Sequence, residues 1–289
     1  MIVITGANGQ LGAAIIENLL RTVPARELVA SVRDPSQAAA LAARGVEVRA
    51  GDFAQPNTLR TAFAGADQVL IVSANKLGEE ARRLHQAAIE AAHAAGVRRI
   101  FYTSHMGARP DSFFEPALNH AASEAMLAAQ GVAYTSLRHG FYAESALHMV
   151  GRGLREGLLR TPEDGPVSWT TRADLAEADA LLLSQAGRFN GFTPPLTAAE
   201  AVTMADLAAL ASDITGREVK HLTVTDDEWL QDQVAHGVPA PVAALLLGSF
   251  KASRRGDFAA VDPTLEALLG RRPQPMRDVL AHALKPAEA

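Results

Sequence analysis

Short apolar runs alternate with longer amphipathic stretches through residues 1–140. The runs are continuously apolar rather than apolar at every second position, which is typical of strands buried on both faces of a sheet. We predict strands at residues 2–5, 28–32, 46–49, 68–73, 97–103 and 133–138. We predict helices between them at residues 11–20, 37–44, 58–64, 79–95 and 117–130. This alternation indicates an α/β fold with a doubly wound, Rossmann-like parallel sheet.

Four glycines mark the ends of predicted helices. Gly45, Gly65, Gly96 and Gly131 each come just after an amphipathic stretch. A residue with positive φ commonly follows the last turn of a helix, and glycine adopts that conformation without steric cost. We therefore expect a left-handed backbone at each of them.

The regular alternation breaks after Tyr142. Gly151, Gly153 and Gly157 are followed closely by Pro162 and Pro166, which indicates an irregular segment. Beyond it we predict a helix at 171–184, a short strand at 189–195, a helix at 203–214 capped by Gly216, a strand at 218–224, and further helices toward the end. We therefore predict a Rossmann domain over residues 1–150. A smaller, mixed α/β cap over a substrate cleft is predicted for residues 151–289, with a soft boundary across which elements can interleave.

Composition narrows the classes of function. The 289 residues include no cysteine, which excludes disulfides, thiolate-bound metal centres and cysteine nucleophiles. The net charge of −5 disfavours nucleic-acid binding, and we expect no nucleic-acid partner. No apolar run is long enough to span a membrane, and the apolar run Met1–Ile4 is too short for a signal peptide and has no basic region before it. We therefore expect a cytoplasmic protein without a membrane partner. The sequence lacks H-E-x-x-H and G-x-S-x-G, and we expect no metal site and no serine hydrolase.

A glycine-rich loop joins the first predicted strand to the first predicted helix. It reads T-G-A-N-G-Q-L-G, with glycines spaced as in dinucleotide-binding loops. The first glycine permits a tight turn, the second lets backbone approach a pyrophosphate, and the third lets helix and strand pack closely. The alternative is a purely structural turn. The candidate cofactor-binding residues of this loop are Thr5, Gly6, Asn8, Gly9, Gln10, Leu11 and Gly12.

Two charged residues at the end of the second predicted strand bear on the choice of nucleotide. Arg33 can pair with a ribose 2′-phosphate, which favours NADP(H). Asp34 could accept a hydrogen bond from a ribose 2′-OH, so NAD(H) stays possible. Both residues could instead be solvated loop charges.

Further cofactor candidates follow the next predicted strands. Asp52 can reach an adenine amino group and Phe53 can cover its ring, although Asp52 could equally cap the next helix. Ser73 and Ala74 follow the fourth strand, and Thr103 ends the fifth. Ligands of open α/β sheets collect at these carboxyl ends.

A family resemblance rests on these motifs. T-G-A-N-G-Q-L-G, V-R-D-P, G-V-E-V-R-A-G-D-F, A-A-G-V-R-R-I-F-Y-T-S and A-Y-T-S-L-R-H-G-F-Y-A-E resemble the NmrA-like group of atypical short-chain dehydrogenase/reductases. Within that group the chain is most similar to the type 2 NAD(P)H:quinone oxidoreductases and the triphenylmethane reductases. The resemblance implies hydride transfer from NADPH to a small planar aromatic substrate such as a quinone or dye. We expect a monomer or a homodimer.

The sequence departs from the wider family in two places. The usual Tyr-x-x-x-Lys pair is absent. No lysine lies four residues after any of the three tyrosines, which are Tyr102, Tyr134 and Tyr142. His139 stands where these relatives typically carry Asn, which places a titratable ring near the expected substrate.

Four residues are candidates for catalysis: Ser104, His120, His139 and Tyr142. Ser104 lies where the resemblance places an active-site hydroxyl, and relatives hold His or Lys near His120. Three of them have a structural alternative: a strand-end turn contact for Ser104, a surface or partner-capped helix position for His120, and core packing for Tyr142. Two further functions stay open. One is a tailoring enzyme that oxygenates or reduces aromatic polyketide-type compounds with His139 as base; the other is a non-catalytic NAD(P) sensor.

Overall fold

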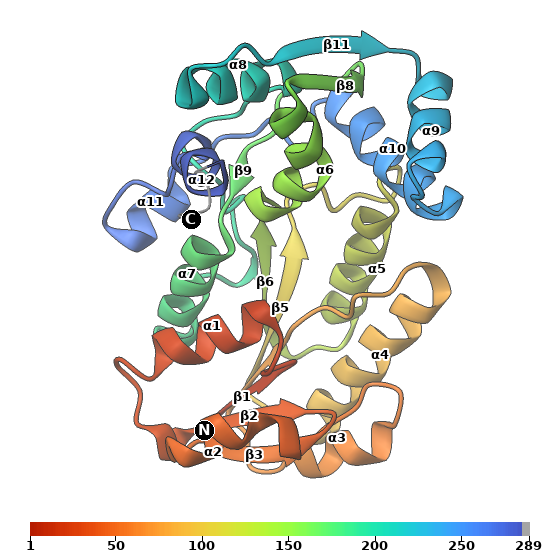
Figure 1. Cartoon of the computed structure of the whole chain (residues 1–289). Helices are drawn as coiled ribbons and strands as arrows, with labels where there is room; N and C mark the ends of the chain where they lie inside the picture. The colour runs from red at the N-terminus through yellow and green to blue at the C-terminus, as the bar shows by residue number, and fades with distance from the viewer. Residues whose placement is uncertain (285–289) are drawn as a thin grey trace. The chain divides into compact units, whose positions relative to one another are not determined.

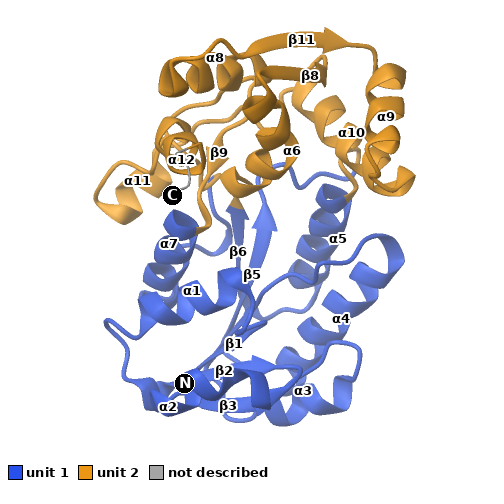
Figure 2. Cartoon of the chain, in the orientation of Figure 1, with its two compact units in different colours: residues 1–110, 116–138, 173–194 blue, residues 111–115, 139–172, 195–289 orange. Residues whose placement is uncertain are grey.

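The computed structural model describes residues 1–284, which fall into two compact units. Unit 1 comprises residues 1–110, 116–138 and 173–194 (Figure 2). Unit 2 comprises residues 111–115, 139–172 and, of the described residues, 195–284. Both units are therefore assembled from segments far apart in the sequence.

Unit 1 is built on a seven-stranded sheet in the order β10-β6-β5-β4-β1-β2-β3. Its strands are β1 (Ile2–Thr5), β2 (Leu28–Val32), β3 (Glu47–Ala50), β4 (Gln68–Ile71), β5 (Arg99–His105), β6 (Ala133–His139) and β10 (Gly191–Phe192). The pairings of β1 with β2 and β4, of β2 with β3, of β4 with β5 and of β6 with β10 are parallel. The strand order reverses direction beside β1, where β2 lies on one side and β4 on the other. The predicted doubly wound parallel sheet is confirmed.

Helices cover both faces of this sheet (Figure 1). They are α1 (Gln10–Leu19), α2 (Ala39–Ala43), α3 (Pro56–Ala62), α4 (Gly78–Ala94), α5 (Glu115–Ala129) and α7 (Arg172–Ser184), with the 3-10 turns η1 (Ala25–Glu27) and η2 (Pro35–Ala38). One apolar core joins the sheet to α3, α4 and α5, with Val69, Ile89 and Leu127 among its buried members. Helices α1 and α7 lie on the other face (Figure 1).

The predicted glycine caps are confirmed. Gly45, Gly65, Gly96 and Gly131 have φ angles of +83°, +71°, +71° and +72°. Each of them follows a helix within a few residues, so the polypeptide leaves the helix through the conformation that glycine adopts most easily.

Unit 2 holds two small parallel sheets, β11-β8 and β7-β9. Its elements are β7 (Phe141–Tyr142), α6 (Ala143–Glu156), β8 (Leu158–Pro162), β9 (Trp169–Thr170), α8 (Met204–Thr215), β11 (Lys220–Val224), α9 (Asp226–Ala235), α10 (Ala240–Arg254), α11 (Thr264–Leu269) and α12 (Met276–Ala283). Rings of Phe114, Phe141, Trp169 and Phe258 contact one another edge-on or tilted in its core.

The prediction of an irregular segment after Tyr142 is wrong. Residues 143–156 form helix α6, whose buried positions Ala143, Ala146, Val150 and Leu154 follow helical spacing. A Cβ atom on Gly153 would stand 2.8 Å from the carbonyl oxygen of Leu158. The glycine therefore serves close packing of β8 against the helix, and Gly157, with φ +84°, ends it.

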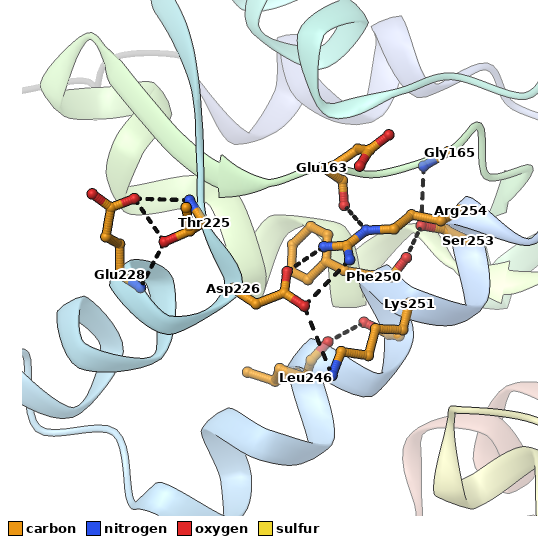
Figure 3. A network of polar contacts seen from close by, with 11 residues as sticks. Glu163, Gly165, Thr225, Asp226, Glu228, Leu246, Phe250, Lys251, Ser253 and Arg254 are labelled. Carbon is orange, nitrogen blue, oxygen red and sulfur yellow. Dashed lines mark hydrogen bonds and ion pairs between the residues drawn. The ribbon is translucent and has the colours of Figure 1, made fainter.

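A polar network fixes the ends of α9 and α10 in unit 2 (Figure 3). Thr225 and Glu228 form a reciprocal capping box at the start of α9. Asp226 in the first turn of α9 pairs with Lys251 and Arg254 near the end of α10. The opposite charges lie at the helix ends that favour them, so each pair also complements a helix dipole.

Among residues 1–284, no helix is long and apolar enough to cross a membrane.

Candidate functional site

The glycine-rich loop turns sharply between β1 and α1. Gly6 has φ +58°, and a Cβ atom on it would lie 3.5 Å from the Cβ of Val72. A Cβ atom on Gly12 would overlap the carbonyl oxygen of Gly6 and stand 3.1 Å from the Cα of Ala7. Gly6 thus makes the tight turn and Gly12 the close packing that the sequence predicts.

The first turn of α1 has no side-chain cap. Gly9 is the N-cap residue, and no acidic residue occupies the turn that follows it. Asn8, Gly9 and Gln10 are exposed, whereas the side chain of Leu11 is buried and leaves only its backbone for a ligand. A helix start with available N–H groups and partial positive charge binds anions. The cradle fits the diphosphate of a dinucleotide.

Arg33 and Asp34 differ in their surroundings after β2. Both carboxylate oxygens of Asp34 accept hydrogen bonds: Oδ1 from the Ser36 amide and hydroxyl, and Oδ2 from the Gln37 side chain. The Ser36 bonds lower the pKa of Asp34 below its usual value. Arg33 is exposed and makes no hydrogen bond or ion pair with other residues of the described range. The guanidinium is therefore available, while the carboxylate already caps η2.

The turn after β3 is held by Asp52. Its Oδ1 accepts from the amide of Ala54 at 2.9 Å, and its own amide donates to Thr58 Oγ1 at 2.9 Å. Phe53 is half-buried and packs against the core cluster beneath α3. These contacts shape the loop into α3, and any adenine contact would have to come in addition to them.

Three successive amides beyond β4 donate to side chains from three different elements. Val72 N–H donates to Thr5 Oγ1, Ser73 N–H to Thr103 Oγ1 and Ala74 N–H to His85 Nε2, each at 2.9 Å. Thr5 also donates to the carbonyl of Leu70, and Thr103 to Ser73 Oγ. The hydroxyls of Thr5 and Thr103 therefore bind the backbone that follows β4 at the carboxyl end of the sheet, and are not left available for a ligand.

Ser104 belongs to a buried carboxylate cluster. Its hydroxyl donates to Glu124 Oε1 at 2.9 Å, and Ser136 donates to the same oxygen at 2.9 Å. Arg138 completes the cluster with two bonds to the carboxylate of Glu124. Ser104 is 4 % exposed. Its hydroxyl hydrogen is thus engaged with Glu124 on α5.

His120 lies in a second cluster, formed around Tyr102. The hydroxyl of Tyr102 lies 3.0 Å from His120 Nδ1 and 3.3 Å from His85 Nδ1. The rings of His120 and His105 stack with centroids 6.1 Å apart. His85 and Tyr102 are buried, whereas His120 is half-exposed. His120 and His105 are therefore the partly exposed members of this cluster.

His139 and Tyr142 belong to unit 2. His139 is buried and forms an isolated bridge with Leu196. The ring centroids of Tyr142 and His139 lie 6.4 Å apart. The guanidinium carbon of Arg172 lies 4.6 Å from the centroid of the Tyr142 ring. These two candidates are neighbours of each other, while Ser104 and His120 lie in unit 1.

Sequence reasoning did not single out His85, Ser123 or Glu124 as members of polar clusters. His85 and Ser123 face inward from α4 and α5 at positions where the amphipathic pattern expects an apolar residue. A polar residue on the apolar face of a helix indicates that it has a buried hydrogen-bond partner. The sequence does not show which residue of a neighbouring element that partner is. Among residues 1–284, no group of three or more His, Asp or Glu residues is arranged to hold a metal ion.

The fold and the loop define a dinucleotide-binding protein of the Rossmann class. Residues 6–185 match the family model described as NAD(P)H-binding, and the chain belongs to that family. It is 36% identical over 285 residues to quinone oxidoreductase 2 of Escherichia coli (strain K12), with 98% of each chain covered. It is 30% identical to the NAD(P)H azoreductase of Xenophilus azovorans, with 94% of this chain and 93% of the relative covered.

Solved structures of nucleotide-bound oxidoreductases are also similar to this chain. The NADPH complex of an NADPH-dependent quinone oxidoreductase from Escherichia coli matches with a TM-score of 0.93 and 35% identity, covering 99% of this chain and 100% of the other. The NADP(H) complex of triphenylmethane reductase from Citrobacter sp. matches with a TM-score of 0.89 and 32% identity, covering 98% and 100%. The resemblance inferred from the sequence motifs is confirmed.

Proposed function

We propose that the protein is an NADPH-dependent reductase of quinones or similar planar aromatic compounds. The observation that carries the proposal is the glycine cradle at an uncapped helix start, in a chain that matches NADPH-bound oxidoreductases along nearly its whole length. The relatives named above are a quinone oxidoreductase, an azoreductase and a triphenylmethane reductase, and the compounds in these names carry conjugated or aromatic rings.

The residues of unit 1 have separate tasks in nucleotide binding. The amides at the start of α1 bind the diphosphate, and the backbone at Gly9 permits its approach. Arg33 binds the 2′-phosphate, since Asp34 is occupied by Ser36 and Gln37. The rim formed by Ser73, Ala74 and Thr103 lies at the carboxyl end of the sheet, where the nicotinamide half binds in such folds.

The chemistry requires one hydride and one proton. A bound NADPH supplies the hydride. A quinone that accepts it becomes the monoanion of a hydroquinone, and one proton completes the reduction. Because that anion is stabilised by its aromatic ring, a hydrogen-bond donor is sufficient and the missing Tyr-x-x-x-Lys pair is not required. We assign this donor role to His120 of unit 1. The catalytic roles expected of His139 and Tyr142 stay predictions.

The test is oxidation of NADPH by purified protein, followed by absorbance of the reduced nicotinamide. A panel of a small benzoquinone, an azo dye and a triphenylmethane dye separates the substrate classes. We expect turnover with at least one planar acceptor and none without an acceptor. Tight NADPH binding by calorimetry together with no turnover across the panel would instead support a nucleotide sensor.

A further inference from the structure

A chain of polar contacts crosses the interior of unit 1 from the rim of the sheet to α5. It begins at the amide of Ala74, continues through His85 on α4 and Tyr102 on β5, and ends at His120 on α5. His85 and Tyr102 are 1 % and 0 % exposed. In such a chain of buried polar groups, each donor needs an acceptor on the next group, so the hydrogen position on one group determines the positions on its neighbours.

The Ala74 amide fixes the tautomer of His85. A backbone N–H can only donate, so Nε2 of His85 is an acceptor without a proton. Burial lowers the pKa of His85 to about 4, so the ring is neutral at pH 7. The proton of the neutral ring is therefore on Nδ1.

The orientation of the next contacts follows from this tautomer. His85 Nδ1–H faces Ser123 Oγ at 2.8 Å and Tyr102 Oη at 3.3 Å. Ser123 directs its own hydrogen to the carbonyl of Asn119 at 2.9 Å, so it accepts from His85. Tyr102 likewise faces a donor at His85 and does not donate there, and Nδ1 of His120 lies 3.0 Å from its hydroxyl oxygen.

We propose that Tyr102 is a positioning residue for the reductase reaction: it donates to His120 Nδ1 and holds that ring with its proton on Nε2, where it hydrogen-bonds the substrate oxygen that gains negative charge. The inference rests on the proposed function for its catalytic consequence. Which ring nitrogen of a neutral histidine carries the proton is set by the hydrogen bond at the other nitrogen. Tyr102 thus acts through His120 and does not itself touch the substrate.

A double-mutant cycle tests this role. Tyr102→Phe removes one hydroxyl, and we expect kcat to fall about 3- to 10-fold with KM within about twofold, as for loss of one neutral hydrogen bond. His120→Gln retains an amide near the Nε2 position but cannot be oriented through Nδ1. In the His120→Gln background, Tyr102→Phe should change kcat by less than about twofold, because both changes remove the same effect.

The control is Tyr134→Phe, which removes a hydroxyl of unit 1 outside this chain and should leave kcat unchanged. Fully additive effects of Tyr102→Phe and His120→Gln would overturn the proposal, since a packing defect is additive. If Tyr102→Phe does not fold, His120→Gln and His120→Asn decide, because Asn places its amide near Nδ1 instead. The proposal requires His120→Gln to be the more active of the two, and equal or reversed activities contradict it.

Ring nitrogen NMR provides a readout independent of turnover. In protein labelled with nitrogen-15, we expect neutral His120 to carry its proton on Nε2 in the wild type and to populate both tautomers in Tyr102→Phe. An unchanged tautomer in the variant overturns the positioning role. If the wild type reduces no acceptor, the proposed function fails, while these spectra still decide whether Tyr102 orients His120.

Discussion

Arg138 donates two hydrogen bonds to Glu124, from Nε to Oε1 at 3.0 Å and from Nη2 to Oε2 at 2.8 Å. The carboxylate is buried on α5, and the guanidinium belongs to β6. The hydrogen bonds that Arg138 donates to Glu124 raise the pKa of its guanidinium. Since Ser104 and Ser136 donate to the same carboxylate, one side chain of α5 is tied to both β5 and β6.

Glu124→Ala should destabilise the protein by about 3 kcal/mol, because it leaves a partly buried guanidinium and two buried hydroxyls without their acceptor. Chemical denaturation measures the change. The matched control is Glu47→Ala, which breaks the exposed pair with Arg49 and should cost less than about 1 kcal/mol. Equal losses in the two variants would contradict the importance assigned to the buried cluster.

Gly12→Ala should weaken both NADPH binding and stability. The added methyl group meets backbone atoms of Gly6 and Ala7, which cannot move aside as a flexible side chain can. We expect a loss of about 1–3 kcal/mol in unfolding free energy. Gly151→Ala is the contrasting variant: its methyl group approaches only the end of the Arg155 side chain within α6, and it should be neutral or stabilising.

Arg33→Ala should lower affinity for NADPH about 10- to 100-fold and leave affinity for NADH unchanged, as expected for loss of a charge-assisted bond to the 2′-phosphate. Calorimetry with each nucleotide measures this ratio. Asp34→Ala is the companion variant, because it removes the cap of η2 while leaving the guanidinium in place. A parallel loss for NADPH and NADH in Arg33→Ala would remove Arg33 from the 2′-phosphate role.

Stability should fall as the pH is lowered through the titration of His85. Its pKa is about 4 in the folded protein and about 6.5 when unfolded, so the unfolded chain takes up the proton first. The contribution is fully present above pH 6.5 and is lost progressively toward pH 4, by up to about 3 kcal/mol. His85→Gln should lack this part of the pH dependence, measured by denaturation at several pH values. His93→Gln, an exposed change on the same helix, should retain it.

The sequence predicted the fold where local chemistry alone decides it. The buried strand runs, the left-handed Gly131 and the tight loop at Gly6 each depend on a few adjacent residues. Helix α6 was not predicted because a glycine such as Gly153 usually weakens a helix. The close approach of the Leu158 backbone explains why glycine stands at this position.

The candidate site was harder to predict for a related reason. Glycine spacing identifies the nucleotide loop directly, whereas the partners of His120 and Ser104 lie on other elements and come together only in the folded sheet. That Thr5 and Thr103 bind amides beyond β4, rather than remaining available to a ligand, likewise depends on strand order. Sequence patterns of period two or 3.6 carry no such information.

The amides of Val72, Ser73 and Ala74 are already hydrogen-bonded to side chains, which lowers the entropy cost of binding a ligand beside them. A segment whose donors are already paired loses little conformational freedom when a small molecule arrives, so little of the interaction energy is consumed in ordering it. The carboxyl end of β4 is thus preorganised by the protein's own side chains.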